Sequence, residues 1–310
     1  MTSVNFATAT TPLSLGIPLL AVAADTFAEH GLDVTYTQTR GSTDTVAAML
    51  NGDLDVAALG SSAVVAAIGE GADFVFLGGG AAPANIVLLR PDKAEESGVS
   101  ENASPRERIQ ALRGLKIGTA TAGSANDLFL RLILQAGGLD PDRDVTIINV
   151  ADFPTLSDGL TQGQYDAVSH AAGVGLERNI LDGSGLKWIS LPDGDVPEIG
   201  ALFASVAATR NWVEQNPEAA DAVYQSLNDA YAMFDDDAES AGEMLRTEYY
   251  SDTDPEAFQL GFELNAPTWS PNAKITKELF DGLIKSMNES GETDYSDIAY
   301  EDIVLKAAQE

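Results

Sequence analysis

The stretch that most constrains the fold is RGSTDTVAAMLNGDLDVAALGSS, residues 40–62, which has glycine and small hydroxyl residues at both ends. Within it, Val46, Met49 and Leu50 fall at helical spacing, and Asn51-Gly52 is a typical helix stop. Residues 55–59, DVAAL, are typical of a short buried strand. With the alternating segment LDVTYTQT before it, this order of strand, turn, helix and strand predicts a parallel α/β unit.

The turns of this unit predict where a ligand would bind. We expect Ser42 or Thr43 to cap the helix, and Asp44 in its first turn complements the helix dipole. A second helix is expected from the segment AVVAAIGEG after Ser61. In parallel sheets the strand-to-helix turns meet at one edge, where ligands bind. Helix N-termini at that edge favour anions or polar atoms, although capping alone also explains each hydroxyl.

The same pattern recurs further along the chain. It comprises a strand ending at Thr119, a turn at Gly123-Ser124, a helix ended by Gly137-Gly138, a strand at 144–150, a short helix at 154–163 and a strand at 166–170. Asp55 and Asp166 each follow a glycine by three residues and open a strand, in GDLDV and GQYDA. Two α/β lobes built alike explain this repetition. The first 31 residues add one more strand, turn and helix, with Pro18 near the helix start.

The remaining segments predict where the chain passes between the lobes. Gly78–Gly80 predict a bend, Ile86–Arg90 a crossover into the second lobe, and the β-rich run from Pro197 a return. We therefore expect residues 1–85 and 200–310 in lobe I and residues 86–199 in lobe II, with Gly78–Gly80 and the return near Pro197 as hinges. The segment from Lys93 is expected to be loop or frayed helix, and four helices are expected after residue 210.

Composition limits the partners and the chemistry. There are 48 acidic and 17 basic residues, a net charge of −31, so the surface repels nucleic acid and anionic membranes. The absence of cysteine excludes disulfides, thiolate catalysis and thiolate-bound metal. With only His30 and His170 as imidazoles, we expect neither a metal nor a cofactor. No stretch reaches the roughly 18 apolar residues of a transmembrane span. The start lacks a signal-peptide pattern, which suits a cytoplasmic chain or a mature exported form.

In this order and spacing, several motifs together resemble the periplasmic substrate-binding proteins of ABC importers. The group is that of nitrate, sulfonate and taurine binders, which also includes binders of pyrimidine precursors. The motifs are EHGLDV, GSTDTVAAMLNGDLDVAALGS, IVLLRPD, LRGLKIGTATAGSANDLFLRLILQAGGLDPDRDVTIINV, LTQGQYDAV and NPEAADAVYQSLNDAY. The resemblance runs nearly from end to end. It implies an α/β, two-lobed periplasmic-binding-protein type II fold with a ligand cleft between the lobes.

The resemblance also implies the ligand-binding residues. They are the loop after the first strand and three of the turns described above, namely Thr10, Thr11, Pro12, Gly41, Ser42, Ser61, Ser62, Gly123 and Ser124. Ligand contact and capping explain the serines equally well. Arg40 is a counter-ion for an anionic ligand or a solvated strand end.

Two further residues belong to the predicted site. Asp152 follows a strand and either accepts a hydrogen bond from an amine or ring N–H or caps a turn. His170 either binds a carboxylate or heterocycle or is a satisfied buried histidine. Ser169-His170 stands where sulfonate binders of the group carry aromatic residues, and this departure argues against a simple alkanesulfonate as ligand.

The function implied is that of a receptor. It is monomeric, not an enzyme, and works in the periplasm or outside the cell, associated with the membrane. It captures a small sulfonate, carboxylate or nitrate by hinge closure and docks on ABC permease subunits. The alternatives are an enzyme of the menaquinone-pathway type and a binder of a pyrimidine or thiamine precursor. The pyrimidine synthase of this superfamily relies on a cysteine-rich motif that is absent here. Asp152 and His170 alone do not make an acid/base pair for the other enzyme.

Overall fold

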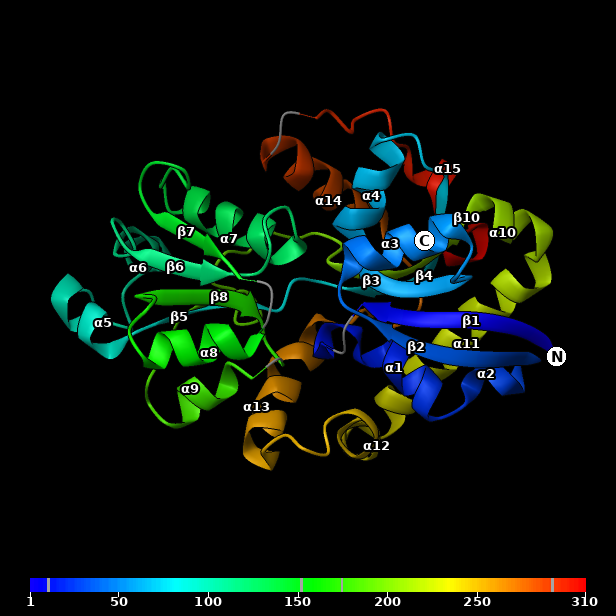
Figure 1. The fold of residues 1–310 in the computed structure, drawn as a ribbon, viewed down its shortest axis with the longest axis horizontal. Helices are drawn as coiled ribbons and strands as arrows, with labels where there is room; N and C mark the ends of the chain where they lie inside the picture. Colours follow the sequence, from blue (N-terminus) through cyan, green and yellow to red (C-terminus); the bar gives the residue numbers. More distant parts are fainter. Residues whose placement is uncertain (10–11, 151–152, 174, 291–292) are drawn as a thin grey trace. The chain divides into compact units, whose positions relative to one another are not determined.

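The computed structural model describes residues 1–9, 12–150, 153–173, 175–290 and 293–310 (Figure 1). It divides into two compact units. Unit 1 comprises Met1–Ala82, Gly200–Asp252 and Trp269–Glu310, and unit 2 comprises Pro83–Ile199 and Thr253–Thr268. Each unit is built around a five-stranded mixed sheet flanked by helices. No helix among the described residues is both long and apolar enough to span a membrane.

The sheet of unit 1 has the order β2-β1-β3-β10-β4. Its strands are β1 (Thr2–Ala9), β2 (Leu32–Thr39), β3 (Val56–Gly60), β4 (Phe74–Ala81) and β10 (Ala204–Thr209). β1, β2 and β3 are parallel, and β10 runs antiparallel to both β3 and β4. The predicted strands at 32–39 and 55–59 are confirmed. They form because alternating and β-branched apolar residues fit a sheet that is covered by helices.

The helices of unit 1 form two layers on this sheet (Figure 1). They are η1 (Leu13–Leu15), α1 (Gly16–Ala23), α2 (Thr26–Glu29), α3 (Ser42–Asn51), α4 (Ser61–Gly69), α10 (Arg210–Gln215), α11 (Pro217–Asp236), α12 (Ala238–Tyr249), α14 (Lys277–Ser290), α15 (Tyr300–Ile303) and η3 (Lys306–Ala308). Helices α1, α2 and α11 pack together in one layer, and α3, α4 and α14 lie in the other. Phe6 packs on Phe27 in the first layer and Phe76 on Phe280 in the second, so the core has two apolar halves.

The sheet of unit 2 repeats this plan with the order β7-β6-β8-β5-β9. Its strands are β5 (Asn85–Leu89), β6 (Lys116–Thr119), β7 (Thr146–Asn149), β8 (Ala167–Ala171) and β9 (Leu186–Ser190). β6, β7 and β8 are parallel, and β5 is antiparallel to β8 and β9. In both units, therefore, the fourth strand of the order is the antiparallel one.

Helices cover both faces of the second sheet (Figure 1). They are α5 (Pro91–Ser97), α6 (Pro105–Gln110), α7 (Ala125–Ala136), α8 (Phe153–Thr161), α9 (Glu177–Leu181), α13 (Pro255–Asn265) and η2 (Ala266–Thr268). One apolar cluster joins the sheet to α6 and α7 and includes Trp188, and a second joins it to α8, α9 and α13. The segment from Lys93, predicted as loop or frayed helix, contains most of α5 and the start of α6. Ser104 and Glu107 stabilise α6 with a capping box.

The two aspartates singled out by their spacing occupy matching places. The N–H of Asn5 donates to Oδ2 of Asp55 at 2.8 Å, and the N–H of Lys116 donates to Oδ2 of Asp166 at 2.9 Å. Each aspartate also donates its own N–H to the carbonyl of the same partner residue. Each therefore pairs the start of one strand with the neighbouring strand, β1 with β3 and β6 with β8.

The predicted bend at Gly78–Gly80 is wrong, because these glycines lie inside the buried strand β4. Gly78 and Gly79 have φ of 136° and 67°, where the pairing with β10 is irregular. Gly79 donates to the carbonyl of Ala273, and the Tyr231 hydroxyl both accepts from and donates to the main chain of Gly80. Glycine is needed here for an irregularity in a strand, since a Cβ on Gly78 would lie 2.7 Å from the Ala273 oxygen.

One helix differs from the predicted division of the chain. Residues 253–268, which we expected in lobe I, pack in unit 2. Leu264 of α13 is part of the apolar cluster under α8 and α9, and Nδ2 of Asn265 donates to the carbonyl of Ala172 at 3.0 Å. The strand expected to be a crossover, β5, is likewise an internal strand of the second sheet.

Candidate functional site

The predicted site residues of unit 1 lie at the carboxyl edge of its sheet. The parallel strands β1, β2 and β3 end there, β4 ends beside Ala204, and β10 begins there. Helices α3 and α4 start directly after β2 and β3. This edge therefore gathers helix N-termini and the serines that open them.

Ser42 does not cap α3, and neither does Thr43, so the predicted N-cap is wrong. Gly41 is the N-cap, with no side-chain cap, and Ser42 is the first helical residue. Its Oγ accepts a hydrogen bond from the N–H of Gly60 at 3.0 Å, which ties the start of α3 to the end of β3. The Thr45 hydroxyl donates to the Gly41 carbonyl at 2.9 Å, so a hydroxyl one turn further along stabilises this helix start.

Ser61 and Ser62 open α4 and are both buried. Oγ of Ser61 shares a hydrogen bond of 2.9 Å with Oγ of Ser205 from β10, and its N–H donates to the carbonyl of Phe203. The Ser61 hydroxyl therefore has a protein partner. Its role toward a ligand stays a prediction.

The other predicted residues of this edge are placed as follows. Pro12 is half-buried and is the N-cap of η1, where its carbonyl accepts from Leu15. Arg40 is exposed directly after β2. Thr10 and Thr11, and Asp152 of unit 2, lie outside the described residues.

The carboxyl edge of unit 2 carries the turn at Gly123-Ser124. Ser124 is the N-cap of α7, and its Oγ accepts from the N–H of Asp127 at 3.4 Å. Gly123 has φ of 76° and donates its N–H to Oδ2 of Asp127 at 3.1 Å. Asp127 is buried and also accepts from Arg131 Nε at 3.2 Å and Asn149 Nδ2 at 3.1 Å. This carboxylate organises the turn and is neutralised by Arg131.

His170 is buried in β8, with 1% of its surface exposed. Burial lowers the pKa of its imidazole to about 4, so the ring is neutral near pH 7. Nδ1 lies 3.1 Å from the carbonyl oxygen of Ala171, and Nε2 lies 3.0 Å from Nδ2 of Asn126. Of the two interpretations of His170, this environment fits a buried histidine whose ring nitrogens both face protein atoms. Any contact with a ligand stays a prediction.

The loop after β8 is organised by a buried carboxylate. Glu177, 1% exposed, accepts from the N–H of Gly173 at 2.6 Å and of Gly175 at 3.0 Å. Burial raises the pKa of this carboxyl, and the two N–H donors partly oppose that shift. Glu177 thus holds the main-chain N–H groups of Gly173 and Gly175.

Several residues of these edges were not singled out from the sequence: Asn85, Asn126, Glu177 and Ser205. The sequence did place Asp127 in a first helical turn, and Asn126 stands beside it in the segment GSAND, so its position could be predicted in the same way. Asn85 and Ser205 stand in otherwise apolar segments, where a lone polar residue in a buried strand is the signal.

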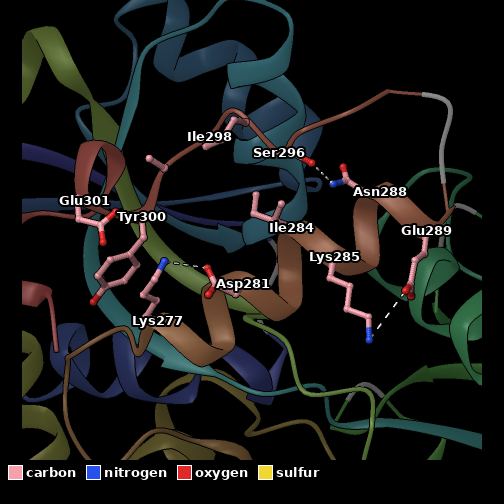
Figure 2. A pocket seen from close by; sticks show the side chains of 11 residues that line it. Lys277, Asp281, Ile284, Lys285, Asn288, Glu289, Ser296, Ile298, Tyr300 and Glu301 are labelled. Atoms are coloured by element: carbon pink, nitrogen blue, oxygen red, sulfur yellow. Dashed lines mark hydrogen bonds and ion pairs between the residues drawn. The ribbon is translucent and has the colours of Figure 1, made fainter.

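A separate groove of about 640 Å³ runs along α14 in unit 1 (Figure 2). Its charges pair along the helix, Lys277 with Asp281 at 3.2 Å and Lys285 with Glu289 at 3.9 Å. Nδ2 of Asn288 donates to Oγ of Ser296 on the facing segment. None of the residues that line the groove was predicted as a site residue, and exposed pairs of this kind are typical of a solvated helix face.

Comparison with known proteins identifies a family and a relative. Residues 9–247 match the model of the NMT1-like family. The nitrate/nitrite binding protein NrtA of Nostoc sp. is 28% identical over 139 residues, which are 43% of this chain and 29% of that protein. The chain thus spans less than a third of that relative.

Solved structures show the fold. The alkanesulfonate-binding protein SsuA of Xanthomonas axonopodis pv. citri, bound to MOPS, has a TM-score of 0.74 and 15% identity, covering 100% of this chain and 99% of that one. A Candida albicans protein with the generic periplasmic binding protein fold has a TM-score of 0.71 and 12% identity, covering 99% and 97%. The fold is therefore the α/β periplasmic-binding-protein fold. Because the family model matches more than two thirds of its residues, the chain belongs to the NMT1-like family.

Proposed function

We propose that this chain is the solute-binding component of an ABC importer and that its ligand is a small oxyanion of the nitrate, sulfonate or carboxylate class. The observation that carries the proposal is the similarity of this chain to proteins that are named as binders of nitrate and nitrite and of alkanesulfonates. In this role the chain is not an enzyme. It works outside the cytoplasm as a monomer, docks on permease subunits, and captures its ligand by hinge closure.

The donors at the two carboxyl edges support an anionic ligand. Helices α3, α4 and α7 begin there, and the first N–H groups of a helix have no acceptor within it. Glycine and serine open these helices, and their first turns hold two carboxylates, the exposed Asp44 and Asp127, which pairs with Arg131. N–H groups at a helix start bind oxyanions without a basic side chain.

The net charge of −31 opposes anion capture only at long range. Exposed charges are screened beyond about 8 Å at physiological salt, whereas helix N-termini act within the first turn. Local donors therefore dominate at the site. The acidic surface is expected to slow the association of anions at low salt.

A ligand screen tests the proposal. Thermal unfolding is followed with nitrate, taurine, MOPS, benzoate, uracil and thiamine, because a ligand of the native state raises the apparent Tm. We expect a rise with at least one oxyanion, and a smaller radius of gyration by X-ray scattering with that anion bound. A rise with only uracil or thiamine supports the precursor binder. Conversion of the ligand into a product would overturn the proposal that this chain is a receptor.

Two charge variants locate the site. Ser42→Asp and Ser124→Asp keep an oxygen that accepts from Gly60 and Asp127 respectively, so the folded structure is retained. Each places a negative charge at a carboxyl edge, and we expect anion binding to be abolished. The matched control is Thr209→Asp, which changes another N-cap at the opposite edge of the unit 1 sheet. Binding that survives in both variants overturns the assignment of the site.

A further inference from the structure

Asn126 lies half-buried in the first turn of α7, and its side-chain amide contacts three protein groups. Oδ1 accepts from the N–H of Ala171 at 2.8 Å and from Nδ2 of Asn85 at 3.0 Å. Nδ2 lies 3.0 Å from Nε2 of His170. An asparagine side chain offers four hydrogen-bonding positions, so one amide N–H is left. In the part of the chain that the structure describes, that N–H has no partner.

The direction of every bond in this set follows from one main-chain group. The N–H of Ala171 can only donate, so the Asn126 atom facing it is the oxygen. Nδ2 therefore faces His170, and Nε2 of that ring must accept. The proton of the neutral ring is then on Nδ1, where it is donated to the Ala171 carbonyl. Flipping the amide would set Nδ2 against the Ala171 N–H, so the orientation is determined.

Two buried polar atoms on the strands beside α7 are incompletely paired, and one of them belongs to Asn85, which donates to Asn126. Oδ1 of Asn85 and Oγ of Ser169 are buried and have no hydrogen-bond partner among the described residues. Both residues stand on the adjacent strands β5 and β8, which α7 contacts. Buried polar atoms are rarely left unpaired, so this set indicates that a water or a ligand group completes it.

Resting on the proposed function, we infer that Asn126 is a ligand-contacting residue of unit 2 and that His170 and Asn85 are positioning residues that keep its remaining N–H available. The site then selects a ligand atom that accepts a hydrogen bond, such as an anionic or carbonyl oxygen. His170 acts through Asn126, because both ring nitrogens already face protein atoms. The main-chain N–H groups of the same helical turn add to this donor.

Binding variants test the inference with nitrate, methanesulfonate, benzoate and uracil as probes, measured by calorimetry at pH 7. Asn126→Asp replaces the donor by an oxygen, and we expect at least tenfold weaker binding of the preferred probe. His170→Phe removes the acceptor that orients the amide, and a loss of about tenfold is expected. His170→Gln supplies another acceptor and is expected to restore binding to within about threefold. The matched control Asn102→Asp, an exposed unit 2 residue, should leave affinity unchanged.

A measurement without ligand separates this inference from the proposed function. The ¹⁵N NMR shifts of His170 at pH 7 should show a protonated Nδ1 and a bare Nε2, and the Nε2 resonance should move in Asn126→Asp. A proton on Nε2 overturns the inference, and so does unchanged affinity in Asn126→Asp. Binding of uracil alone, lost in that variant, overturns the anion proposal and sustains the inference. If no probe binds the wild type, both are overturned.

Discussion

The two units share a strand order and a strand-pairing aspartate, yet different side chains hold their carboxyl edges. In unit 1 the bonds join hydroxyls to one another or to main chain, as in Ser42 with Gly60 and Ser61 with Ser205. In unit 2 they join carboxylates, an amide and an imidazole around Asp127 and His170. The same sheet plan thus has one carboxyl edge held by hydrogen bonds of uncharged groups and another held by hydrogen bonds of ionisable groups. Loss of charge and change of pH should therefore act mainly on unit 2.

The largest effect is expected from Asp127→Ala. The change removes the acceptor of Gly123, Arg131 and Asn149, and breaking a largely buried ion pair should lower the free energy of unfolding by about 3 kcal/mol. Urea unfolding gives this value, and hydrogen exchange of α7 locates it. Asp142→Ala is the matched control, because Asp142 pairs with the same Arg131 but is exposed. An equal loss in both variants would break the contrast between a buried and a solvated carboxylate.

Acid should destabilise unit 2 through His170. Its folded pKa of about 4 lies below the ordinary 6.5, so between these values the unfolded chain binds a proton that the folded chain does not. Stability is therefore lost as pH falls from 6.5 to 4, by about 3 kcal/mol for this one group. Glu177 contributes with the opposite sign, since its raised pKa favours the folded state on acidification. The measurement is urea unfolding from pH 7 to 4 in wild type and His170→Gln, and parallel curves would contradict it.

A smaller effect is expected in the hydroxyl edge of unit 1. Ser61→Ala leaves the buried hydroxyl of Ser205 unpaired, and we expect a loss of about 1–2 kcal/mol that does not depend on pH. Adding Ser205→Ala removes the orphaned group and should recover part of that loss. Chemical unfolding of the four chains of this double-mutant cycle measures the coupling. A loss that depends on pH would show that the unit 1 edge is not held by uncharged groups alone.

The smallest effect should be the same in both units. Asp55→Ala leaves the N–H of Asn5 to solvent, and Asp166→Ala leaves that of Lys116. Each change should lower the free energy of unfolding by about 1 kcal/mol. Hydrogen exchange at Asn5 and Lys116 should accelerate in the corresponding variant. A difference of several kcal/mol between the two would show that the shared spacing hides unequal roles.

Much of the fold could be predicted from alternation of period-two and helical patterns. The segments GSTDTVAAMLN and DVAAL form α3 and β3, and Gly52 ends the helix with φ of 80°, because local residues decide these features. The repeated spacing of Asp55 and Asp166 also indicated a structural feature, because both carboxylates accept from the neighbouring strand. Such signals are contained within one element and its immediate neighbours.

The rest depends on contacts that are distant in sequence. The apolar stripe of α13 does not say which sheet it covers, and only its packing on α8 and α9 decides. Gly78–Gly80 read as a bend because glycine marks bends and strand irregularities alike. His170 could be picked out by residue type, but its neutrality and its bond to Asn126 arise from β8 meeting α7. Serines in loops indicate a binding site in the sequence. They do not indicate which of their hydroxyls already have hydrogen-bond partners in the folded protein.

The assignment of α13 to unit 2 has a consequence for synthesis. The second sheet is complete in sequence by residue 199, yet Leu264, which covers its α8–α9 face, is translated 65 residues later. A ribosome-bound chain that has reached residue 199 therefore presents an open apolar surface around Leu156 and Leu160. Until α13 has been translated, this surface is open to chaperone binding or aggregation. A fragment of residues 83–199 made alone lacks α13, so the surface would stay exposed.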